Sequence, residues 1–456
     1  MKKALLIALC FSFIQHSFSQ RQFNNWYFGY GCGITFNSGT AALIDSTFPM
    51  NTDDNSACIS DYNGNVLFYA NGTTAYDKQG NVMSNGGNLA GNLTGGQTAT
   101  IVQLPGSRVV YYLFTVDAMG WSGGVSYSVV DMSLNSGLGD IITAQKNVSI
   151  LTQATEKIVP IRHANGVDVW IVVHEWNSDA YRSYLLTAAG LSTNPVITHI
   201  GSISTGGYSP GYNAMGQITV NKANDMIAAA TYSDGIIELF DFDNQTGVLS
   251  NRVEIPQYRA WGLEFSNSGQ YLYSTGWTES TIYQYDLSDY SDSSVLSSQV
   301  SIGTCPGQGY LQTGPDGRIY VAKYQSNYLG VINSPNNAGS ASDFVDQGFS
   351  MGTHVSSAGL VDKILYNFTP SGINDQDGAV ALSCYPSPST GSFTIDMSGL
   401  ADGNKQATVY SAVGQIAYQA ESTLDKIVVN NTLAAGFYTV VVRQGSKNYT
   451  AKVVVK

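Results

Sequence analysis

Residues 206–211 read GGYSPG and fit the GxSxG pattern of serine hydrolases. In those enzymes the backbone N–H of the residue after the serine helps to stabilise the oxyanion. Here that residue is Pro210, which has no backbone N–H. The segment that follows, GYNAMGQITV, also reads as loop and strand rather than as the helix that the pattern requires. We therefore expect a loop between strands and not a nucleophile.

A second candidate for chemistry is the stretch VVHEW at 172–176. His174 is the one histidine after residue 19 with a directly adjacent acid, Glu175. Together with Asp117, these residues are where an enzymatic site for acid–base work would be sought, as in a propeller lactonase, lyase or glycosidase. The spacing favours a hydrogen-bonded structural histidine at the end of a strand, so no catalytic residue is assigned.

Three other stretches match ion- or phosphate-binding loops only in part. GYGCG (29–33) is not followed by Lys-Ser/Thr or by a helix. INDQDG (373–378) would begin an EF-hand loop with Ile373 and end it with Cys384, where oxygen ligands are needed. NTDDNSA (51–57) is acidic but gives only a weak cation-binding signal. The sequence therefore predicts no metal site and no cofactor.

Four cysteines follow residue 19, namely Cys32, Cys58, Cys305 and Cys384. An exported protein can oxidise its cysteines, and four allow three pairings. Cys32 and Cys58 lie closest in sequence, so this pair is the first expectation. No CxxC motif and no Cys/His cluster suggests zinc.

The N-terminus predicts export. Lys2 and Lys3 precede an apolar stretch at 4–14, and small residues Ser17 and Ser19 suit cleavage before Gln20. No later apolar run reaches the ~18–20 residues that span a bilayer. The formal net charge is -12, which argues against a nucleic-acid partner because a basic stripe would be expected there.

Helical periodicity is almost absent from the sequence, so short strands must position these candidate residues. One unit recurs: a strand, a tight turn, a second strand rich in Tyr, Val and Phe, a polar loop, then a third and often a fourth strand. The turn with its second strand lies at 61–70, 104–116, 163–174, 221–232, 266–277 and 314–324. A four-stranded repeat of roughly 40–60 residues indicates a β-propeller, because radial packing covers both faces of sheets that cannot bury themselves.

Two further β-type stretches, 24–39 and 359–368, flank the six units. We expect them to share a seventh blade that closes the ring; a six-bladed ring with an extra hairpin is the alternative. The unit GPDGRIYVAKYQSNYLGVIN resembles the YVTN and lactonase-type seven-bladed propellers. The pattern over 24–368, with WYFG at 26–29 and YSVVDM at 127–132, also resembles secreted propeller proteins of bacteria that use the type 9 secretion system. That family implies no activity.

The repeat predicts where a ligand would sit. All loops between second and third strands should open on one face, together with the loops that lead into the next blade. The aromatic residues recur there, and such rings suit sugars or protein loops, although a role in packing between blades is the alternative. The predicted ligand-binding residues are Trp121, Trp176, Tyr232, Trp277, Tyr324, Tyr208 and Arg259.

The C-terminal stretch reads as six or seven short alternating strands, which suits a small immunoglobulin-like sandwich. YPSPSTGSFTI (385–395) comes first, then VYSAVGQIAY (409–418), then LAAGFYTVVVRQGSKNYTAKVVVK (433–456). In this order the motifs resemble the type A C-terminal sorting domain of the type 9 secretion system, with Ser387 where Asn is usual. The resemblance implies export by that machinery, followed by cleavage and a lipopolysaccharide anchor. The matching sorting residues are Tyr385, Pro386, Pro388, Gly391, Gly414, Gly436, Tyr438, Lys452 and Lys456.

The sequence thus predicts an all-β chain: a signal peptide at 1–19, a seven-bladed propeller at 20–370, a linker at 371–383 and a sorting domain at 384–456. The predicted function is a secreted or surface-attached, non-catalytic module that binds a glycan or a surface protein. The alternatives are a propeller enzyme with a site on the loop face and a structural component of a surface layer or motility apparatus.

Overall fold

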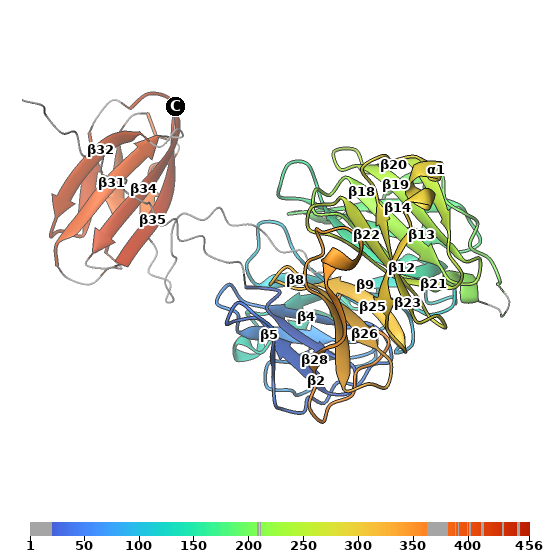
Figure 1. Ribbon diagram of the computed structural model, residues 1–456. Helices are drawn as coiled ribbons and strands as arrows, with labels where there is room; N and C mark the ends of the chain where they lie inside the picture. The colour runs from blue at the N-terminus through green and yellow to red at the C-terminus, as the bar shows by residue number, and fades with distance from the viewer. Residues whose placement is uncertain are drawn as a thin grey trace, which may run out of the picture. The chain divides into compact units, whose positions relative to one another are not determined.

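The computed structural model describes residues 21–362 and 382–456, apart from 208, 210, 388, 391, 399, 401–402, 412–414, 431–432 and 445–446. These residues form two compact units, a larger one at 21–362 and a smaller one at 382–456. The predicted signal peptide and nearly all of the predicted linker lie outside the described residues. Figure 1 shows the strands of the larger unit in blue to orange and those of the smaller unit in red.

The larger unit is a seven-bladed β-propeller, since its residues form seven antiparallel sheets. Two sheets have three strands each: β1 (Asn25–Phe28), β2 (Cys32–Thr35) and β3 (Ala42–Leu43) form one, and β4 (Ala57–Ser60), β5 (Val66–Ala70) and β6 (Ala75–Asp77) form the other. One sheet of four strands holds β17 (Ile218–Val220), β18 (Met226–Thr231), β19 (Ile236–Asp243) and β20 (Val248–Pro256). Two have split outer strands: β7 (Ala99–Gln103), β8 (Val110–Val116) and β9 (Val125–Asp131) with β10 (Asp140–Ile141) and β11 (Val148–Leu151); and β12 (Ala154–Arg162), β13 (Val169–Glu175) and β14 (Ala180–Thr187) with β15 (Gly190–Leu191) and β16 (Val196–His199). The last two are β21 (Ala260–Phe265), β22 (Tyr271–Gly276), β23 (Thr281–Asp286) and β24 (Val300–Thr304); and β25 (Gln308–Thr313), β26 (Ile319–Lys323), β27 (Tyr328–Ile332) and β28 (Phe344–Ser350).

The blades pack through both faces of their middle strands. For example, β13 reads VWIVVHE and is buried along almost its whole length. Its residues Ile171 and Val173 join Phe114 of β8 and Ile158 of β12 in one hydrophobic cluster between neighbouring sheets. Strands covered on both faces read as continuous apolar runs rather than as alternating patterns. This explains why the second strand of each repeat is so rich in Val, Ile and Tyr.

The two ends of the propeller close the ring together. Residues 358–362 lie between β25 and β4: the Tyr310 amide donates to the Ala358 carbonyl at 2.8 Å, and the Asp362 amide donates to the Ser56 carbonyl at 2.8 Å. Strands β1 and β2 pack on the same cluster as Leu360 and Val361. In Figure 1 the blue strands β2 and β4 accordingly lie near the orange strands β26 and β28. The predicted seventh blade is confirmed over the described part of 359–368.

Helices are few among the described residues. One α-helix, α1 (Asp292–Ser297), and four short 3-10 segments, η1 (Asn135–Gly137), η2 (Thr143–Gln145), η3 (Tyr212–Ala214) and η4 (Gly339–Ser342), lie in connections between strands. In the part of the chain that the structure describes, no helix has the length and apolar character needed to cross a bilayer.

The smaller unit is a β-sandwich. One sheet holds β29 (Ser383–Tyr385), β30 (Phe393–Asp396) and β33 (Lys426–Val429), and the other holds β31 (Lys405–Ser411), β32 (Ile416–Ser422), β34 (Gly436–Gln444) and β35 (Lys447–Val455). Alternate residues of both sheets, such as Ile395, Val409 and Val440, meet in a common core. The immunoglobulin-like sandwich expected from the sequence is therefore present.

The expected disulfide between Cys32 and Cys58 is wrong, since all four described cysteines are free thiols. Cys32 lies on β2 and Cys58 on β4, in different sheets, and the Cys32 thiol donates to the Val355 carbonyl at 3.1 Å. Closeness in sequence did not reveal that the two residues belong to two different, neighbouring blades. Burial raises the pKa of Cys32 to about 12 and the pKa of Cys58 still further.

We therefore predict that the folded protein reacts slowly with a thiol reagent. Cys32, Cys58 and Cys305 are buried, and only Cys384 is partly exposed. A thiolate is the reactive form, so a raised pKa slows the reaction further. Titration with a chromogenic disulfide, first native and then in denaturant without reductant, should release the three buried thiols only on unfolding. A deficit of two thiols in the denatured chain would instead indicate a disulfide.

Candidate functional site

The loops that connect second to third strands open on one side of the propeller. Because the inner strands lie side by side and run in the same direction, the loops leading into each next inner strand open there too. Backbone hydrogen bonds tie the two sets together: Trp277 donates to Arg259 at 3.2 Å, and Tyr324 donates to Gly307 at 2.7 Å. We call this side the loop face, made by residues 29–31, 44–56, 71–74, 91–98, 117–124, 152–153, 176–179, 200–217, 232–235, 257–259, 277–280, 305–307, 324–327 and 351–357.

Three predicted site residues of the loop face belong to one aromatic cluster. Trp277 lies 4.9 Å from Trp261 and 5.5 Å from Tyr324, measured between ring centroids. Tyr232 meets Trp261 edge-on at 5.5 Å, and Tyr310 stacks on Trp261 at 5.2 Å. Tyr232, Trp261 and Tyr310 are buried, whereas Trp277 is half-buried and Tyr324 is exposed. The cluster therefore has a fixed base and an accessible rim.

Trp261 was missed by the sequence reasoning. It lies inside the inner strand β21, where an aromatic residue reads as ordinary strand core. The aromatic residues were sought in loops, and nothing in the local sequence shows that this side chain supports three others.

Trp121 and Trp176 belong to loops of neighbouring blades that touch at Gly120. The Trp176 ring covers the backbone of Gly120, where a Cβ atom would collide with it and where φ is +68°. Trp121 itself is 54% exposed. Because Gly120 has no side chain, the Trp176 ring of the next blade can pack directly against its backbone.

Arg259 is also on the loop face, with its guanidinium 5.1 Å from the Tyr258 ring centroid and 5.7 Å from that of Tyr232. The remaining predicted ligand residue, Tyr208, lies outside the described residues.

Backbone strain gathers at the same loops. Of the twelve described non-glycine residues with positive φ, nine are Asn, Asp or Ser. The other three are Met119, Arg259 and Gln325, with φ of 55°, 48° and 55°. Each lies one or two residues from an exposed aromatic residue of the loop face. A bulky residue in this conformation costs about 1–3 kcal/mol and is found mostly where function requires it.

Behind the aromatic cluster lie two buried acids. The Glu156 carboxylate accepts hydrogen bonds from the Gly96 amide at 2.7 Å and the Met119 amide at 2.8 Å. Burial raises the pKa of Glu156 despite these bonds. Burial, with the nearby charge of Glu156, raises the pKa of Asp54 well above its usual range. The neighbouring Lys157 donates to the Ala214 carbonyl at 3.1 Å, and burial lowers its pKa to about 8.

The residues of the enzymatic alternative do not converge. His174 is buried and neither ring nitrogen has a hydrogen-bond partner among the described residues, so the expected hydrogen bond of this histidine is wrong. Its ring packs against Tyr181 at 4.5 Å, and burial lowers its pKa to about 3. Glu175, next on the strand, points to the other face of the sheet and pairs with Arg182 at 2.8 Å. Asp117 accepts the amides of Ala118 at 2.9 Å and Gly123 at 3.1 Å and so shapes its own loop. Each of the three has a structural role.

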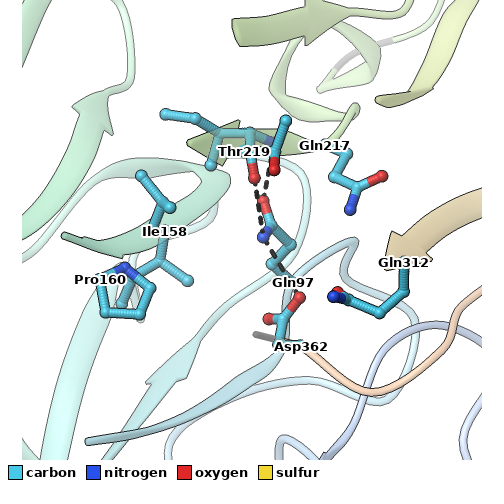
Figure 2. Close-up of a pocket in the computed structure, with 9 residues that line it drawn as sticks. Gln97, Ile158, Pro160, Gln217, Thr219, Gln312 and Asp362 are labelled. Atoms are coloured by element: carbon cyan, nitrogen blue, oxygen red, sulfur yellow. Dashed lines mark hydrogen bonds between the residues drawn. The ribbon is translucent and has the colours of Figure 1, made fainter. Parts of the chain in front are cut away.

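The central channel is crossed by a polar network below the aromatic cluster. Gln97 accepts a hydrogen bond from the Ile218 amide at 2.9 Å and donates to the Ile218 carbonyl and to Asp362, both at 3.2 Å. Figure 2 shows the Gln97 side chain between the strand that carries Thr219 and the Asp362 carboxylate, beside a small cavity. Asp362 also accepts from Asn55 at 2.6 Å and from Thr100 at 3.1 Å. Burial raises the pKa of Asp362 to about 7.

In the sandwich the first and last sorting motifs lie side by side. The Ser389 amide donates to the Val454 carbonyl at 2.7 Å, and the Lys456 amide donates back to Ser389 at 2.8 Å. Ser387, which stands where Asn is usual, accepts the Val454 amide at 3.1 Å. This hydroxyl therefore still ties the opening step to the final strand.

Two tyrosines of the sorting motifs are also fixed. Tyr385, which precedes Pro386, donates to Asp396 at 3.1 Å, and Tyr438 donates to the Ala434 carbonyl at 2.8 Å. Gly436 pairs with Val455 across β34 and β35. Pro388, Gly391, Gly414 and the side chain of Lys452 lie outside the described residues.

Several solved propeller structures are similar to the chain at low identity. A putative 6-phosphogluconolactonase from Bacteroides fragilis matches at 11% identity and a TM-score of 0.45, over 75% of this chain and 98% of its own. A functionally unknown protein from Desulfotomaculum acetoxidans matches at 14% and 0.42, over 73% and 95%. A periplasmic gluconolactonase from Pseudomonas aeruginosa matches at 10% and 0.38, over 78% and 94%. These similarities assign no activity to the chain.

No curated protein matches the chain in sequence. Residues 383–456 match the family model described as a secretion system C-terminal sorting domain, which confirms the resemblance found in the tail motifs. Such a domain implies export through the type 9 secretion machinery. The chain is thus a β-propeller that carries a C-terminal secretion sorting domain.

Proposed function

We propose that the propeller is a non-catalytic binding module for a glycan or a surface protein, displayed on the outer cell surface or released from it. The observation that carries this proposal is the distribution of exposed aromatic side chains. Five are exposed among the described propeller residues, and four of these, Tyr30, Trp121, Tyr258 and Tyr324, lie on the loop face. The fifth, Tyr62, lies in a turn at the opposite end of the blades.

Two features of the site support binding rather than reaction. One exposed ring, that of Tyr324, rests on a rigid base, since it contacts Trp277, which in turn packs on the buried Trp261. Rigid aromatic rings with polar tips provide contact area at a small entropic cost, which suits recognition. Two acids of this region, Glu156 and Asp117, are engaged with backbone amides.

The proposal is tested with a variant in which Trp121, Trp176 and Trp277 are all replaced by Ala. We expect binding to a glycan array or to a panel of cell-surface proteins to fall at least tenfold, because each lost ring removes about 1–3 kcal/mol of burial on contact. The matched control is Tyr62→Ala, which removes an equally exposed ring from the opposite end. Both variants are first checked for a native circular dichroism spectrum. Undiminished binding by the triple variant would exclude the loop face as the binding site.

A further inference from the structure

The loop face combines its aromatic residues with acids in a regular way. In four of the loops between second and third strands, an aromatic residue is accompanied by an acid within four positions. The pairs are Trp121 with Asp117, Trp176 with Asp179, Tyr232 with Asp234, and Trp277 with Glu279. These four pairs are neighbours in sequence, and on the same face the Tyr30 hydroxyl makes a direct contact by donating to the Asp53 carboxylate. Aromatic rings and carboxylates thus recur in the same loops.

The loops of this face are strongly acidic as a set. They carry one Lys or Arg, Arg259, against seven acids: Asp45, Asp53, Asp54, Asp117, Asp179, Asp234 and Glu279. Asp54 is buried and its pKa is raised, which favours its uncharged form. The other six acids against one base give these loops a formal net charge of -5, on the face that also carries four of the five exposed propeller rings. The turns at the opposite end also contain basic residues, namely Arg21, Lys78, Arg108, Lys222 and Arg318.

Within the described residues, none of the seven forms an ion pair with Lys or Arg, and Asp179 is paired with His199 at 2.6 Å, an ion pair when that histidine is protonated. The Asp234 carboxylate accepts a hydrogen bond from the side-chain amide of Asn213 at 2.9 Å and lies near the buried Lys157. A face lined by charges of one sign attracts ligands of the opposite sign and raises their association rate.

The face already holds one cation against its rings. The Arg259 guanidinium lies within 5.1 Å of the Tyr258 ring centroid, inside the distance at which a cation is attracted to an aromatic face. A planar guanidinium therefore fits this surface, with rings for stacking and carboxylates for its N–H groups.

We propose that the loop face binds a basic protein segment, whose Arg or Lys side chains stack on the exposed rings and pair with the neighbouring carboxylates. This inference rests on the proposed binding function and specifies the ligand. Acidic loops disfavour a sulfated or uronic-acid glycan, and a neutral glycan would leave the unpaired carboxylates without a role.

The test uses the full exported chain and a fluorescent hexa-arginine peptide, with binding followed by anisotropy at low and physiological salt. The variant combines Asp53→Asn, Asp234→Asn and Glu279→Gln. The matched control combines Asp61→Asn, Asp225→Asn and Asp289→Asn, which removes the same charge from the opposite end. We expect the loop-face variant to bind at least tenfold more weakly at low salt and the control to change less than twofold. Equal losses in the two variants would show unspecific attraction and overturn the proposal.

Two further probes separate this inference from the proposed function. A neutral chito-oligosaccharide that binds the native chain and the acid variant alike, but not the Trp121, Trp176 and Trp277 variant, would leave the binding function standing and overturn the cationic ligand. A glucosamine oligomer that displaces the peptide at lower concentration than unlabelled hexa-arginine would identify an amino sugar and overturn the protein segment. Hexa-glutamate should not compete.

Discussion

Replacing Asp362 by Asn should remove a large part of the loss of propeller stability between about pH 4 and pH 7, with the rest due to the buried Asp54 and Glu156. Burial raises the pKa of Asp362 from 3.8 to about 7, and none of its hydrogen-bond partners carries a positive charge. The folded protein therefore keeps a proton that the unfolded chain releases over this range. The contribution of Asp362 to the free energy of unfolding is therefore largest below about pH 4, decreases as the pH rises towards 7 and is constant above that.

The pKa of Asp362 is raised by roughly three pH units, and each unit corresponds to about 1.4 kcal/mol. The free energy of unfolding should therefore fall by about 4 kcal/mol over this pH range because of this group. Asn keeps the shape and an acceptor oxygen for Asn55 and Gln97 without a charge to bury. The variant should thus equal or exceed the native protein in stability at pH 8 and lose its advantage near pH 4.5.

Urea unfolding followed by tryptophan fluorescence measures this directly, because all six tryptophans precede residue 278 and report on the propeller alone. The control is Asp225→Asn, which removes a charge in a surface turn and should leave the pH profile unchanged. A native profile that is already flat between pH 4 and 7, or a variant with the native slope, would contradict the prediction.

Replacing Gln97 by Leu should destabilise the propeller by about 3–5 kcal/mol. The side chain satisfies both backbone groups of Ile218 and one oxygen of Asp362, and all of these are buried. Leu has a similar volume but leaves both backbone groups of Ile218 without their partner, at about 1–3 kcal/mol apiece. It also removes one of the three donors to Asp362, which keeps those of Asn55 and Thr100. Water that enters the neighbouring cavity can recover part of this loss.

Gln312→Leu is the matched control for this second prediction. Gln312 lines the same cavity, but among the described residues its side chain makes a single hydrogen bond, to the Thr313 carbonyl at 3.2 Å. Its replacement should cost about 1 kcal/mol. If the two variants unfold at the same urea concentration, Gln97 does not bridge the channel in the way described.

The propeller could be predicted from the sequence because its information is local and repeated. Turns such as PDG at 315–317 and second strands such as VWIVV predict each blade separately, and the motifs of the C-terminal stretch predict the sandwich. The polar network of the channel has no such local sequence signal. Gln97 and Asp362 are 265 positions apart, and each reads alone as an ordinary strand residue. Only the closed ring brings them together.

The candidate site could also be predicted only where its residues follow from the repeat. The loop aromatics Trp121, Trp176, Trp277 and Tyr324 follow from the repeat, since each occupies the same place in its unit. Their support by Trp261, the strain at Met119 and Gln325, and the separation of Cys32 from Cys58 depend on contacts between blades. The sequence carries no local signal for such contacts.

The position of residues 358–362 in the ring has a consequence for how the protein is made. The first strands emerge from the ribosome more than 300 residues before the segment that completes their blade, so the ring stays open until synthesis is nearly finished. The sorting domain begins about twenty residues after that segment, at residue 383. A chain truncated before the closing segment therefore lacks the sorting domain as well, so one truncation removes both the closure of the ring and the export signal.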